Sequence, residues 1–483
     1  MQQILPWTAF ASAAFHVVLA AGLSLRVLSS RRPTGVSLAW IVLLLSFPLA
    51  GALIYVFVGE TWLSGRRSRR TAEAARKLQD PLAEMEQRFG ITTALDHHAA
   101  RAIANLGQSA GLSPPLGGNS VLLFDEADSV FDRMISDIGA AQHECDCLYY
   151  IWESEGRVLD VEAALTAAVE RGVQCRVLVD AVGARRFLRS PAARRLRLVG
   201  VQIRAALPVN LLRSRLHRID LRNHRKMIVI DNQIAYVGSM NMVDPKTFQN
   251  GEGYGAWVDL TIRTQGPSAM LLSELFEIDW AMESSEVYRT QIDSRSVSIR
   301  GDEVLQVVPS GPGQQPSTIF RIMTAAVYGA QDRLLLTTPY FVPDETFVAG
   351  LVSAAIRGVE TTVVVPARVN GFLTRMAGRS YYDELLGAGV NVYLYKDDML
   401  HAKTLTVDDA VGVIGTVNLD RRSFWLNYEL SLVLHGSSAV ERLAAAQSGY
   451  IARSVALSGS GWMKRGRITR YIENGAQLLS PIL

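Results

Sequence analysis

The sequence has few cysteines and almost no net charge. Its 483 residues include three cysteines, and 49 basic against 46 acidic residues give a formal net charge of +3. Cys145, Cys147 and Cys175 form no even, spaced set, which argues against a disulfide framework and indicates a reducing compartment. A zinc site needs about four ligands at recognisable spacings, and the sequence shows no such group. A near-neutral chain without a long basic run is also not typical of a nucleic-acid-binding protein.

Two long segments near the N-terminus lack charged side chains altogether. Residues 1–25 and 34–59 contain no Asp, Glu, Lys or Arg, and each could supply the roughly 20 apolar residues that cross a bilayer as a helix. A signal peptide carries basic residues before its apolar segment, whereas no Lys or Arg precedes Arg26. We therefore predict a transmembrane anchor of two helices over residues 1–60.

The charges that flank these segments predict an orientation. Basic residues follow the second segment at Arg66, Arg67, Arg69, Arg70, Arg76 and Lys77. Cytoplasmic flanks of membrane segments carry an excess of such residues. We predict a multi-pass protein of the cell inner (plasma) membrane, with its long C-terminal part in the cytoplasm. A basic, helical linker over residues 61–118 would join the anchor to that part.

One stretch of the sequence occurs twice in similar form. "LRNHRKMIVIDNQIAYVGSMN" spans residues 221–241, and "DMLHAKTLTVDDAVGVIGTVN" spans residues 398–418. An alignment without gaps matches His224 with His401, Lys226 with Lys403, Asp231 with Asp408, Gly238 with Gly415, Ser239 with Thr416, Asn241 with Asn418 and Glu252 with Glu429. This number of matched positions indicates an internal duplication.

The duplication extends upstream of the two motifs. "AALTAAVERGVQCRVLVD" (163–180) resembles "AGLVSAAIRGVETTVVVP" (349–366), and each is typical of a helix, a turn with glycine and a buried strand. The first copy has an insertion near residues 205–218, before its histidine. We predict an α/β fold of two related halves, residues 119–300 and 301–483. Each half would be a mixed sheet covered by helices, related to the other by a pseudo-twofold axis.

The paired motifs predict phosphoryl-transfer chemistry. Side chains alternate along a strand, so the histidine and the lysine of each motif share one face. Two halves brought together would place two imidazoles and two ammonium groups around a phosphodiester, and the lysines would stabilise its developing charge. One neutral histidine could attack phosphorus, while the other, protonated, could donate a proton to the leaving alkoxide. No metal or other cofactor is required by this chemistry.

The remaining matched residues would support these groups. The turn that holds the hydroxyl and the amide could bind the phosphate oxygens, through Ser239, Asn241, Thr416 and Asn418. Each glutamate follows its histidine at the same distance along the sequence, so we expect Glu252 to orient His224 and Glu429 to orient His401. A carboxylate on the far ring nitrogen fixes the tautomer of a catalytic histidine.

The two H-x-K-x4-D-x6-G-[ST]-x-N motifs resemble those of the phospholipase D superfamily. The stretches "TPYFVPDE" (338–345), "NLDRRSFWLNYE" (418–429) and the terminal "LLSPIL" are similar to those of bacterial cardiolipin synthases. The resemblance implies a duplicated phospholipase D-like fold and the catalytic residues His224, Lys226, Asp231, His401, Lys403 and Asp408. It also implies that His224 is the nucleophile and His401 the general acid and base, although the pseudo-symmetry of the two halves leaves the reverse order open.

The resemblance further implies a ping-pong reaction at the membrane. One phosphatidylglycerol would give its phosphatidyl group to a histidine and release glycerol, and a second would accept the group to form cardiolipin. The partners would be phosphatidylglycerol, other anionic lipids and the bilayer, but no nucleic acid. A phospholipase D-type hydrolase that releases phosphatidic acid, a nucleic-acid phosphodiesterase and a non-catalytic lipid-binding scaffold are the alternatives. The residues leave open whether the acceptor is phosphatidylglycerol or phosphatidylethanolamine.

Overall fold

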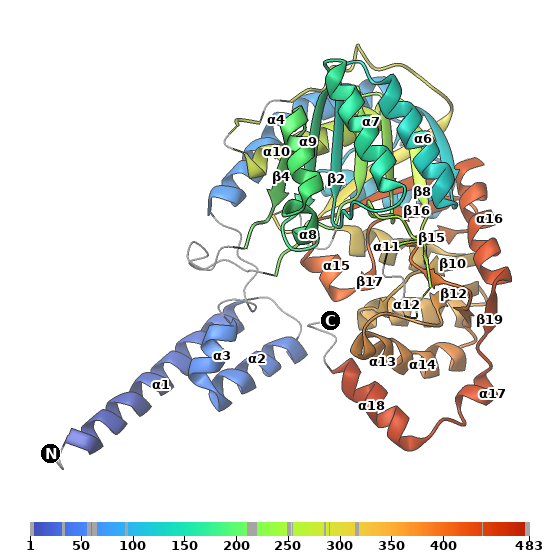
Figure 1. The fold of residues 1–483 in the computed structure, drawn as a ribbon. Coiled ribbons are helices and arrows are strands. Elements are labelled where there is room, and N and C mark those ends of the chain that lie inside the picture. The colour runs from blue at the N-terminus through green and yellow to red at the C-terminus, as the bar shows by residue number, and fades with distance from the viewer. Residues whose placement is uncertain are drawn as a thin grey trace. The chain divides into compact units, whose positions relative to one another are not determined.

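The chain forms two compact units in this computed structural model, which is drawn in Figure 1. One unit comprises Met1–Arg69 with Val209–Leu221, and the other comprises Arg70–Pro208 with Arg222–Leu483. We call the second the catalytic unit. The structure describes residues 4–30, 34–55, 59, 65–91, 95–209, 220–248, 253, 255–284, 286–288, 290–313, 318–436 and 438–478.

The N-terminal apolar segments form three helices. They are α1 (Ile4–Ser29), α2 (Thr34–Ser46) and α3 (Pro48–Ile54). The prediction of one continuous second helix over residues 34–59 is wrong. Phe47 leaves the helical conformation at φ −137° and ψ 67°, because the ring of Pro48 disfavours helical dihedrals in the residue before it. Among the residues that the structure describes, no helix combines the length and apolar character needed to cross a membrane.

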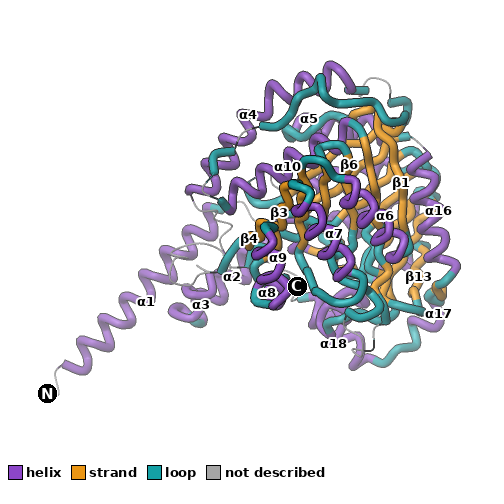
Figure 2. The backbone as a smooth tube through the Cα atoms, turned by 45° about the horizontal axis from the view of Figure 1, so that its top comes forward, coloured by secondary structure: helices purple, strands orange, loops and turns teal. Residues whose placement is uncertain are grey.

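A 15-stranded mixed sheet runs through the catalytic unit (Figure 2). The first half contributes β1 (Leu116–Phe124), β2 (Glu144–Tyr149), β3 (Gln174–Asp180), β4 (Gln202–Ala206), β5 (Met227–Ile230), β6 (Ile234–Gly238) and β8 (Thr261–Gln265). The second half contributes β9 (Glu303–Ser310), β10 (Arg333–Thr337), β12 (Glu360–Pro366), β13 (Asn391–Tyr395), β15 (Thr404–Val407), β16 (Val411–Gly415) and β18 (Glu429–His435), with β19 (Ser454–Ala456) at the edge.

The strand order confirms the predicted duplication. It reads β4-β3-β2-β5-β6-β8-β1 in the first half and β13-β12-β10-β15-β16-β18-β9 in the second. Strands β2, β3 and β4 are parallel and β5 is antiparallel to β2, as β10, β12 and β13 are parallel and β15 is antiparallel to β10. The halves join through the antiparallel pair β1 and β9, so they share one continuous sheet.

Helices cover both faces of this sheet, which gives three layers. Those of the first half are α6 (Ala127–Ala140), α7 (Val158–Glu170), α8 (Arg185–Leu188), α9 (Pro191–Val199) and α10 (Pro267–Glu283), preceded by α4 (Gly65–Phe89) and α5 (His98–Ser109). Those of the second half are α11 (Thr318–Gly329), α12 (Glu345–Ile356), α13 (Phe372–Ser380), α14 (Tyr382–Gly387), α15 (Arg421–Trp425), α16 (Ser438–Ala452), α17 (Gly459–Trp462) and α18 (Arg467–Gln477). Figure 2 shows α6 and α7 over one face of the first half.

Matched hairpins carry the two sequence motifs. Strands β5 and β6 are joined by Asp231 and Asn232 at φ 50° and 57°, and β15 and β16 by Asp408 and Asp409, both at φ 51°. Two successive residues with positive φ form the tight turn that suits the twist of a hairpin. The glycine that ends the second strand is also required: a Cβ on Gly238 or Gly415 would lie 2.2 Å from the carbonyl oxygen of Leu260 or Leu430.

Candidate active site

His224 is held by the second half of the catalytic unit. Its backbone N–H donates to the carbonyl of Tyr428 over 2.8 Å. Its ring Nδ1 lies 2.9 Å and 3.0 Å from the two carboxylate oxygens of Glu429. The ring also meets the edge of Tyr150, with ring centroids 4.9 Å apart. His224 and Glu429 are both buried, so the contact is shielded from water.

His401 is held in the same way by the first half. Its backbone N–H donates to the carbonyl of Val258 over 2.8 Å, where β14 (Met399–Leu400) pairs with β7 (Trp257–Val258). Its Nδ1 lies 2.6 Å from a carboxylate oxygen of Asp259. The ring stacks on Trp257, with centroids 4.1 Å apart. Each histidine is therefore positioned by the half that does not contain it.

This arrangement differs from the expected pairing of each histidine with the carboxylate of its own sequence motif. Glu429 contacts His224 and not His401, its partner in the sequence repeat. The carboxylate on His401 comes from Asp259, and Glu252 lies outside the described residues. The connection from Ser239 to Asp259 spans 20 positions, whereas the connection from Thr416 to Glu429 spans 13. An alignment without gaps therefore misses the structural counterpart of Glu429.

The hydroxyl groups of the motifs hold these carboxylates. Ser239 donates to Asp259 over 2.6 Å and accepts from the backbone N–H of Leu260. Thr416 donates to Glu429 over 2.5 Å and accepts from the backbone N–H of Leu430. The expected role of Ser239 and Thr416 in binding phosphate stays a prediction, but the contacts favour a supporting role, because both buried hydroxyls hold the carboxylates.

The two motif asparagines differ in their contacts. The side-chain oxygen of Asn241 accepts from the backbone N–H of Ile151 over 3.1 Å. The side-chain oxygen of Asn418 is buried without a hydrogen-bond partner among the described residues. A role of these amides in binding phosphate stays a prediction.

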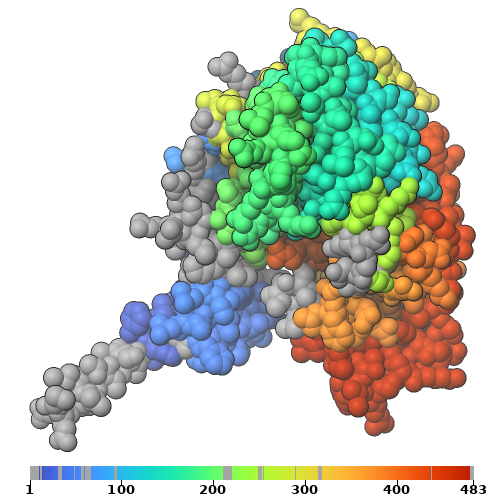
Figure 3. Space-filling model, viewed as in Figure 1, coloured from blue at the N-terminus to red at the C-terminus, as the bar shows by residue number. Residues whose placement is uncertain are grey.

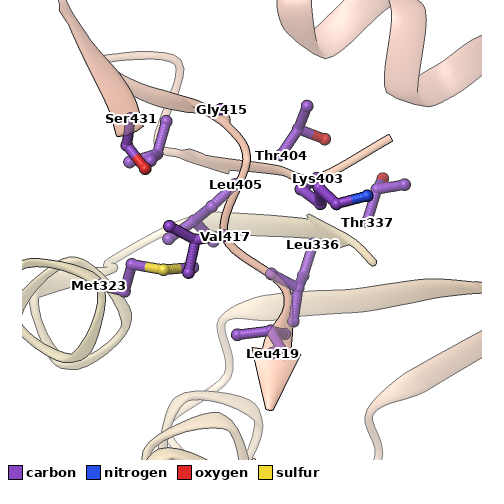
Figure 4. A pocket seen from close by; sticks show the side chains of 11 residues that line it. Met323, Leu336, Thr337, Lys403, Thr404, Leu405, Gly415, Val417, Leu419 and Ser431 are labelled. Atoms are coloured by element: carbon purple, nitrogen blue, oxygen red, sulfur yellow. The ribbon is translucent and has the colours of Figure 1, made fainter. Parts of the chain in front are cut away.

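The two lysines lie buried beside the histidines. Lys226 donates to the carbonyl of His224 over 2.7 Å, and Lys403 donates to that of His401 over 2.6 Å. Burial lowers the pKa of Lys226 to about 8 and that of Lys403 to about 7. The positive charge of Lys226 further lowers the pKa of Lys403. Lys403 also lines a small cavity with Thr337 and Ser431 (Figure 4).

Both imidazoles favour the neutral form. Burial lowers the pKa of His401 to about 4, and it lowers the pKa of His224 although Glu429 opposes the change. Burial would raise the pKa of each carboxyl, but the nearby histidine and lysine outweigh it and lower the pKa of Asp259 and of Glu429. The expected pair of one protonated and one neutral histidine is therefore not the favoured state without substrate. A bound phosphodiester anion would favour protonation of one ring.

The motif aspartates lie at the opposite end of the hairpin strands. Asp231 accepts the backbone N–H groups of residues 142, 143 and 144 over 2.7–2.9 Å. Asp408 accepts those of residues 331, 332 and 333 over 2.8–2.9 Å. Strands β5 and β15, of four residues each, separate these turns from the histidines. The catalytic role expected of Asp231 and Asp408 stays a prediction, but these contacts favour a structural role, in which both residues fasten the hairpin to the start of the neighbouring strand.

Replacement of Asp408 tests this assignment. Asp408→Ala should lower the free energy of unfolding by about 2 kcal/mol, because backbone donors lose their acceptor and alanine is strained at positive φ. The turnover number per folded molecule should change by less than about threefold, since the site itself is untouched. Asp409→Ala is the matched control, because Asp409 has the same φ of 51°. A loss of turnover without a loss of stability would restore a catalytic role.

Asp259 is the main residue that the sequence motifs do not reveal. It precedes Leu260 and Thr261, as Glu429 precedes Leu430 and Ser431. This shared order of acid, leucine and hydroxyl is a signal that a search beyond the gapless alignment could have used. Asp259 lies just before β8, and Glu429 is the first residue of β18. These two strands pair with the strands that end at the motif glycines, Gly238 and Gly415.

The described residues contain one group of carboxylates close enough to share an ion, and it lies apart from the histidines. The group comprises Glu144, Asp146 and Glu277. The guanidinium of Arg176 already contacts all three, at 2.5–3.4 Å. A metal ion would compete with that charge, so the group does not fit a cation site.

The arrangement leaves one ring nitrogen of each histidine available for chemistry. Nδ1 is occupied by a carboxylate in both cases, so Nε2 is the atom that can attack phosphorus or move a proton. A duplicated α/β fold that joins two such histidines and two lysines defines a phosphoryl-transfer enzyme with paired histidines. Comparison with known proteins shows the family to which the chain belongs.

The family model described as "Cardiolipin synthase, PLD-like domain" matches residues 134–265 and 323–448. The chain is 38% identical to "Cardiolipin synthase A" of Serratia proteamaculans (strain 568) over 96% of both chains. It is 36% identical to the protein of the same name from Erwinia tasmaniensis, again over 96% of both. The chain belongs to the cardiolipin synthase family of the phospholipase D superfamily.

Two further comparisons concern parts of the chain. A model described as "Phospholipase_D-nuclease N-terminal" matches residues 13–60. The crystal structure of phosphatidylserine synthase from Haemophilus influenzae Rd KW20 aligns with 79% of this chain and 100% of its own, at a TM-score of 0.59 and 13% identity. At that identity the likeness concerns the fold alone.

Proposed function

We propose that this protein is a membrane-bound transphosphatidylase that makes cardiolipin and glycerol from two phosphatidylglycerol molecules. The observation that carries the proposal is the reciprocal pair of histidines, His224 on Glu429 and His401 on Asp259. The similarity to cardiolipin synthases over 96% of both chains supports the choice of lipid.

In the first step, Nε2 of His224 attacks the phosphorus of one phosphatidylglycerol. The bond from phosphorus to the headgroup oxygen breaks, and His401, protonated once the anionic substrate is bound, gives its proton to the departing glycerol. Lys226 and Lys403 stabilise the charge on the phosphoryl oxygens. The product is a phosphatidyl group on His224, whose Nδ1–H remains held by Glu429.

In the second step, the headgroup hydroxyl of another phosphatidylglycerol enters. His401, now neutral, removes the hydroxyl proton, and the oxygen attacks phosphorus while the bond to His224 breaks. Cardiolipin leaves, and His401 is again protonated for the next cycle. Water in place of the lipid alcohol would give phosphatidic acid instead.

The same proposal includes the membrane. Residues 1–60 would anchor the chain in the cell inner membrane, supported by the two segments without charged side chains and by the family match over residues 13–60. The basic residues of the segment 66–77 favour a cytoplasmic catalytic unit. A site close to the bilayer suits a substrate that is itself a membrane lipid.

The deciding experiment follows the fate of phosphatidylglycerol labelled in its headgroup glycerol. We expect cardiolipin and free glycerol in about equal amounts from purified protein in mixed micelles, as the ping-pong scheme requires. A second reaction supplies phosphatidylethanolamine as an additional acceptor and identifies which alcohol is used. Phosphatidic acid as the main product would establish a hydrolase and overturn the proposal.

The lowered pKa values of the lysines predict proton uptake on ligand binding. Lys403, with a pKa of about 7, and Lys226, with a pKa of about 8, are only partly protonated in the free site at mildly alkaline pH. An anionic ligand favours the ammonium form, so sn-glycerol 3-phosphate should bind at about pH 8 with uptake of roughly one proton. Calorimetry in two buffers of different ionisation enthalpy measures this number.

Lys403→Met should reduce the proton uptake. Lys246→Met is the matched control, since Lys246 is exposed and lies on the surface beside Asp128. Binding without proton uptake in the unaltered protein would show that both lysines are already charged, and would contradict the predicted shift.

A further inference from the structure

Helix α18 (Arg467–Gln477) exposes an apolar face. The side chains of Ile468 and Tyr471 are 76% and 74% exposed, Ile472 is 45% exposed, and Leu478 just beyond the helix is 82% exposed. Tyr471 and Ile472 follow Ile468 by three and four residues, and Leu478 follows Tyr471 by seven. Residues at these spacings share one side of a helix. The helix lies at the surface of the catalytic unit, near the C-terminal end of the described chain (Figures 1 and 3).

The opposite side of α18 faces the protein and carries charge. Glu473 is completely buried. It accepts from the guanidinium of Arg379 on α13 over 2.7 Å and from that of Arg465 over 2.8 Å. Both guanidinium groups lie over the ring of Trp462, at 4.6 Å and 4.2 Å from its centroid. Ala476 is the other buried residue of the helix.

This polarity is the reverse of that expected for a surface helix. Such helices normally pack their apolar stripe on the core and show charge to water. Here the charged residue is buried and the large apolar side chains are exposed, so the folding of the catalytic unit does not account for them. Single exposed apolar residues are common, but a contiguous face of them marks a surface that meets another apolar phase.

Positive charge accompanies the apolar face. Lys464 and Arg467, just before and at the start of the helix, are both exposed, and Met463 beside them is 57% exposed. A basic, apolar helix of this kind binds in the plane of a membrane that contains anionic lipids. The charge therefore favours a lipid surface over an uncharged protein partner.

We propose that α18 docks on an anionic bilayer. Ile468, Tyr471 and Ile472 would enter the boundary between headgroups and acyl chains, while Lys464 and Arg467 would meet lipid phosphates. The buried contacts of Glu473 hold the helix in the orientation that presents this face. The inference rests on exposure and charge and does not depend on the proposed reaction.

The test must report on α18 itself. An anchor over residues 1–60 would keep the whole chain on vesicles, so sedimentation with lipid would not distinguish the variants. We would place an environment-sensitive fluorophore on Tyr471→Cys in the full chain. The native thiols, Cys145, Cys147 and Cys175, are buried, which limits background labelling. Ile356→Cys is the matched control, because Ile356 is a 71% exposed apolar residue at the end of α12.

In vesicles of phosphatidylcholine with phosphatidylglycerol, the label at 471 should shift its emission to the blue and be protected from iodide. Lipids that carry a quencher near the headgroup should quench it more than lipids with the quencher at the end of the acyl chain, because an interfacial helix enters only about 5–10 Å. The effect should weaken in vesicles of phosphatidylcholine alone. The label at 356 should stay accessible to iodide in both.

Three results would overturn the proposal. In the first, the label at 471 is as accessible to iodide as the label at 356. In the second, it is quenched most strongly by lipids that carry the quencher at the end of the acyl chain. In the third, it is protected from iodide in detergent without vesicles, and the protection increases with protein concentration. The last result would indicate self-association through α18. Because none of these readings needs turnover, an inactive protein that docks would contradict the proposed function and leave this inference standing.

A second variant separates docking from folding. Ile468→Ser combined with Tyr471→Ser should leave the unfolding temperature unchanged, since the two side chains are 76% and 74% exposed. It should raise the apparent KM for phosphatidylglycerol in vesicles several-fold, with little change for a short-chain, water-soluble phosphatidylglycerol. Ile356→Ser should change neither value. An equal loss on both substrates would also contradict docking.

Discussion

His224→Ala and His401→Ala should each reduce cardiolipin formation by at least about 10⁴-fold, because residues that act as one unit fail together when either is removed. Both rings are buried between the halves and each has a carboxylate on Nδ1. His143→Ala is the control, since the side chain of His143 is exposed and outside the site. Turnover of the headgroup-labelled lipid, with the unfolding temperature of each variant, gives the comparison.

A substrate with a better leaving group should distinguish the catalytic roles of the two histidines. A phosphatidyl ester of p-nitrophenol needs no proton for its departing oxygen, so His401→Ala should release nitrophenol in a burst as His224 becomes phosphorylated. His224→Ala should show no burst, because the attacking nitrogen is absent. The reverse pattern would assign His401 as the nucleophile and contradict the order given in the proposed mechanism.

Asp259→Asn should reduce turnover by about 10³–10⁴-fold, the range seen when a catalytic histidine loses the carboxylate that fixes its tautomer. Its effect should follow that of His401→Ala: a large loss with phosphatidylglycerol and a retained burst with the nitrophenyl ester. Glu429→Gln should follow His224→Ala and lose the burst. These patterns measure which carboxylate serves which histidine, independently of any general loss of stability.

Glu252→Gln provides the contrast for this experiment. The sequence repeat favours Glu252 as the counterpart of Glu429, whereas the contacts of His401 favour Asp259. We expect Glu252→Gln to cost less than about tenfold, because another carboxylate already occupies Nδ1 of His401. If the variant at 252 lost as much activity as that at 259, the alignment would be the better guide and the role given to Asp259 would be wrong.

The repeated motifs allowed much of the catalytic unit to be predicted. The matching spacing of the histidines, lysines and glycines indicated two related α/β halves. The expected strand alternation does not apply to the histidines and lysines themselves, because these residues precede β5 and β15 and lie outside both strands. The recurring glycine and the aspartate turn were read as motif residues, but their reasons are geometric. Gly415 lies too close to the carbonyl of Leu430 for a side chain, and Asp408 fastens its hairpin to backbone N–H groups.

The N-terminal segments show the opposite case. Composition alone predicted two uninterrupted helices, but the chain turns at Phe47 because Pro48 follows it. The residue type that breaks the helix was visible, yet the pattern of uncharged residues outweighed it in the prediction. Hydropathy describes which segments avoid water and does not determine where a helix ends.

Local patterns in the chain were sufficient to identify the paired histidines, the paired lysines and the duplication, because each motif spans only about twenty consecutive residues and its spacing can be compared directly. The partners of the histidines were decided only by tertiary structure. His224 and Glu429 are 205 positions apart, and His401 and Asp259 are 142 apart. The contact of His401 arises where β7 pairs with β14, and that of His224 arises where Asn223 pairs with Tyr428. A loop of different length in each half hides the equivalence of the two acids from a gapless alignment.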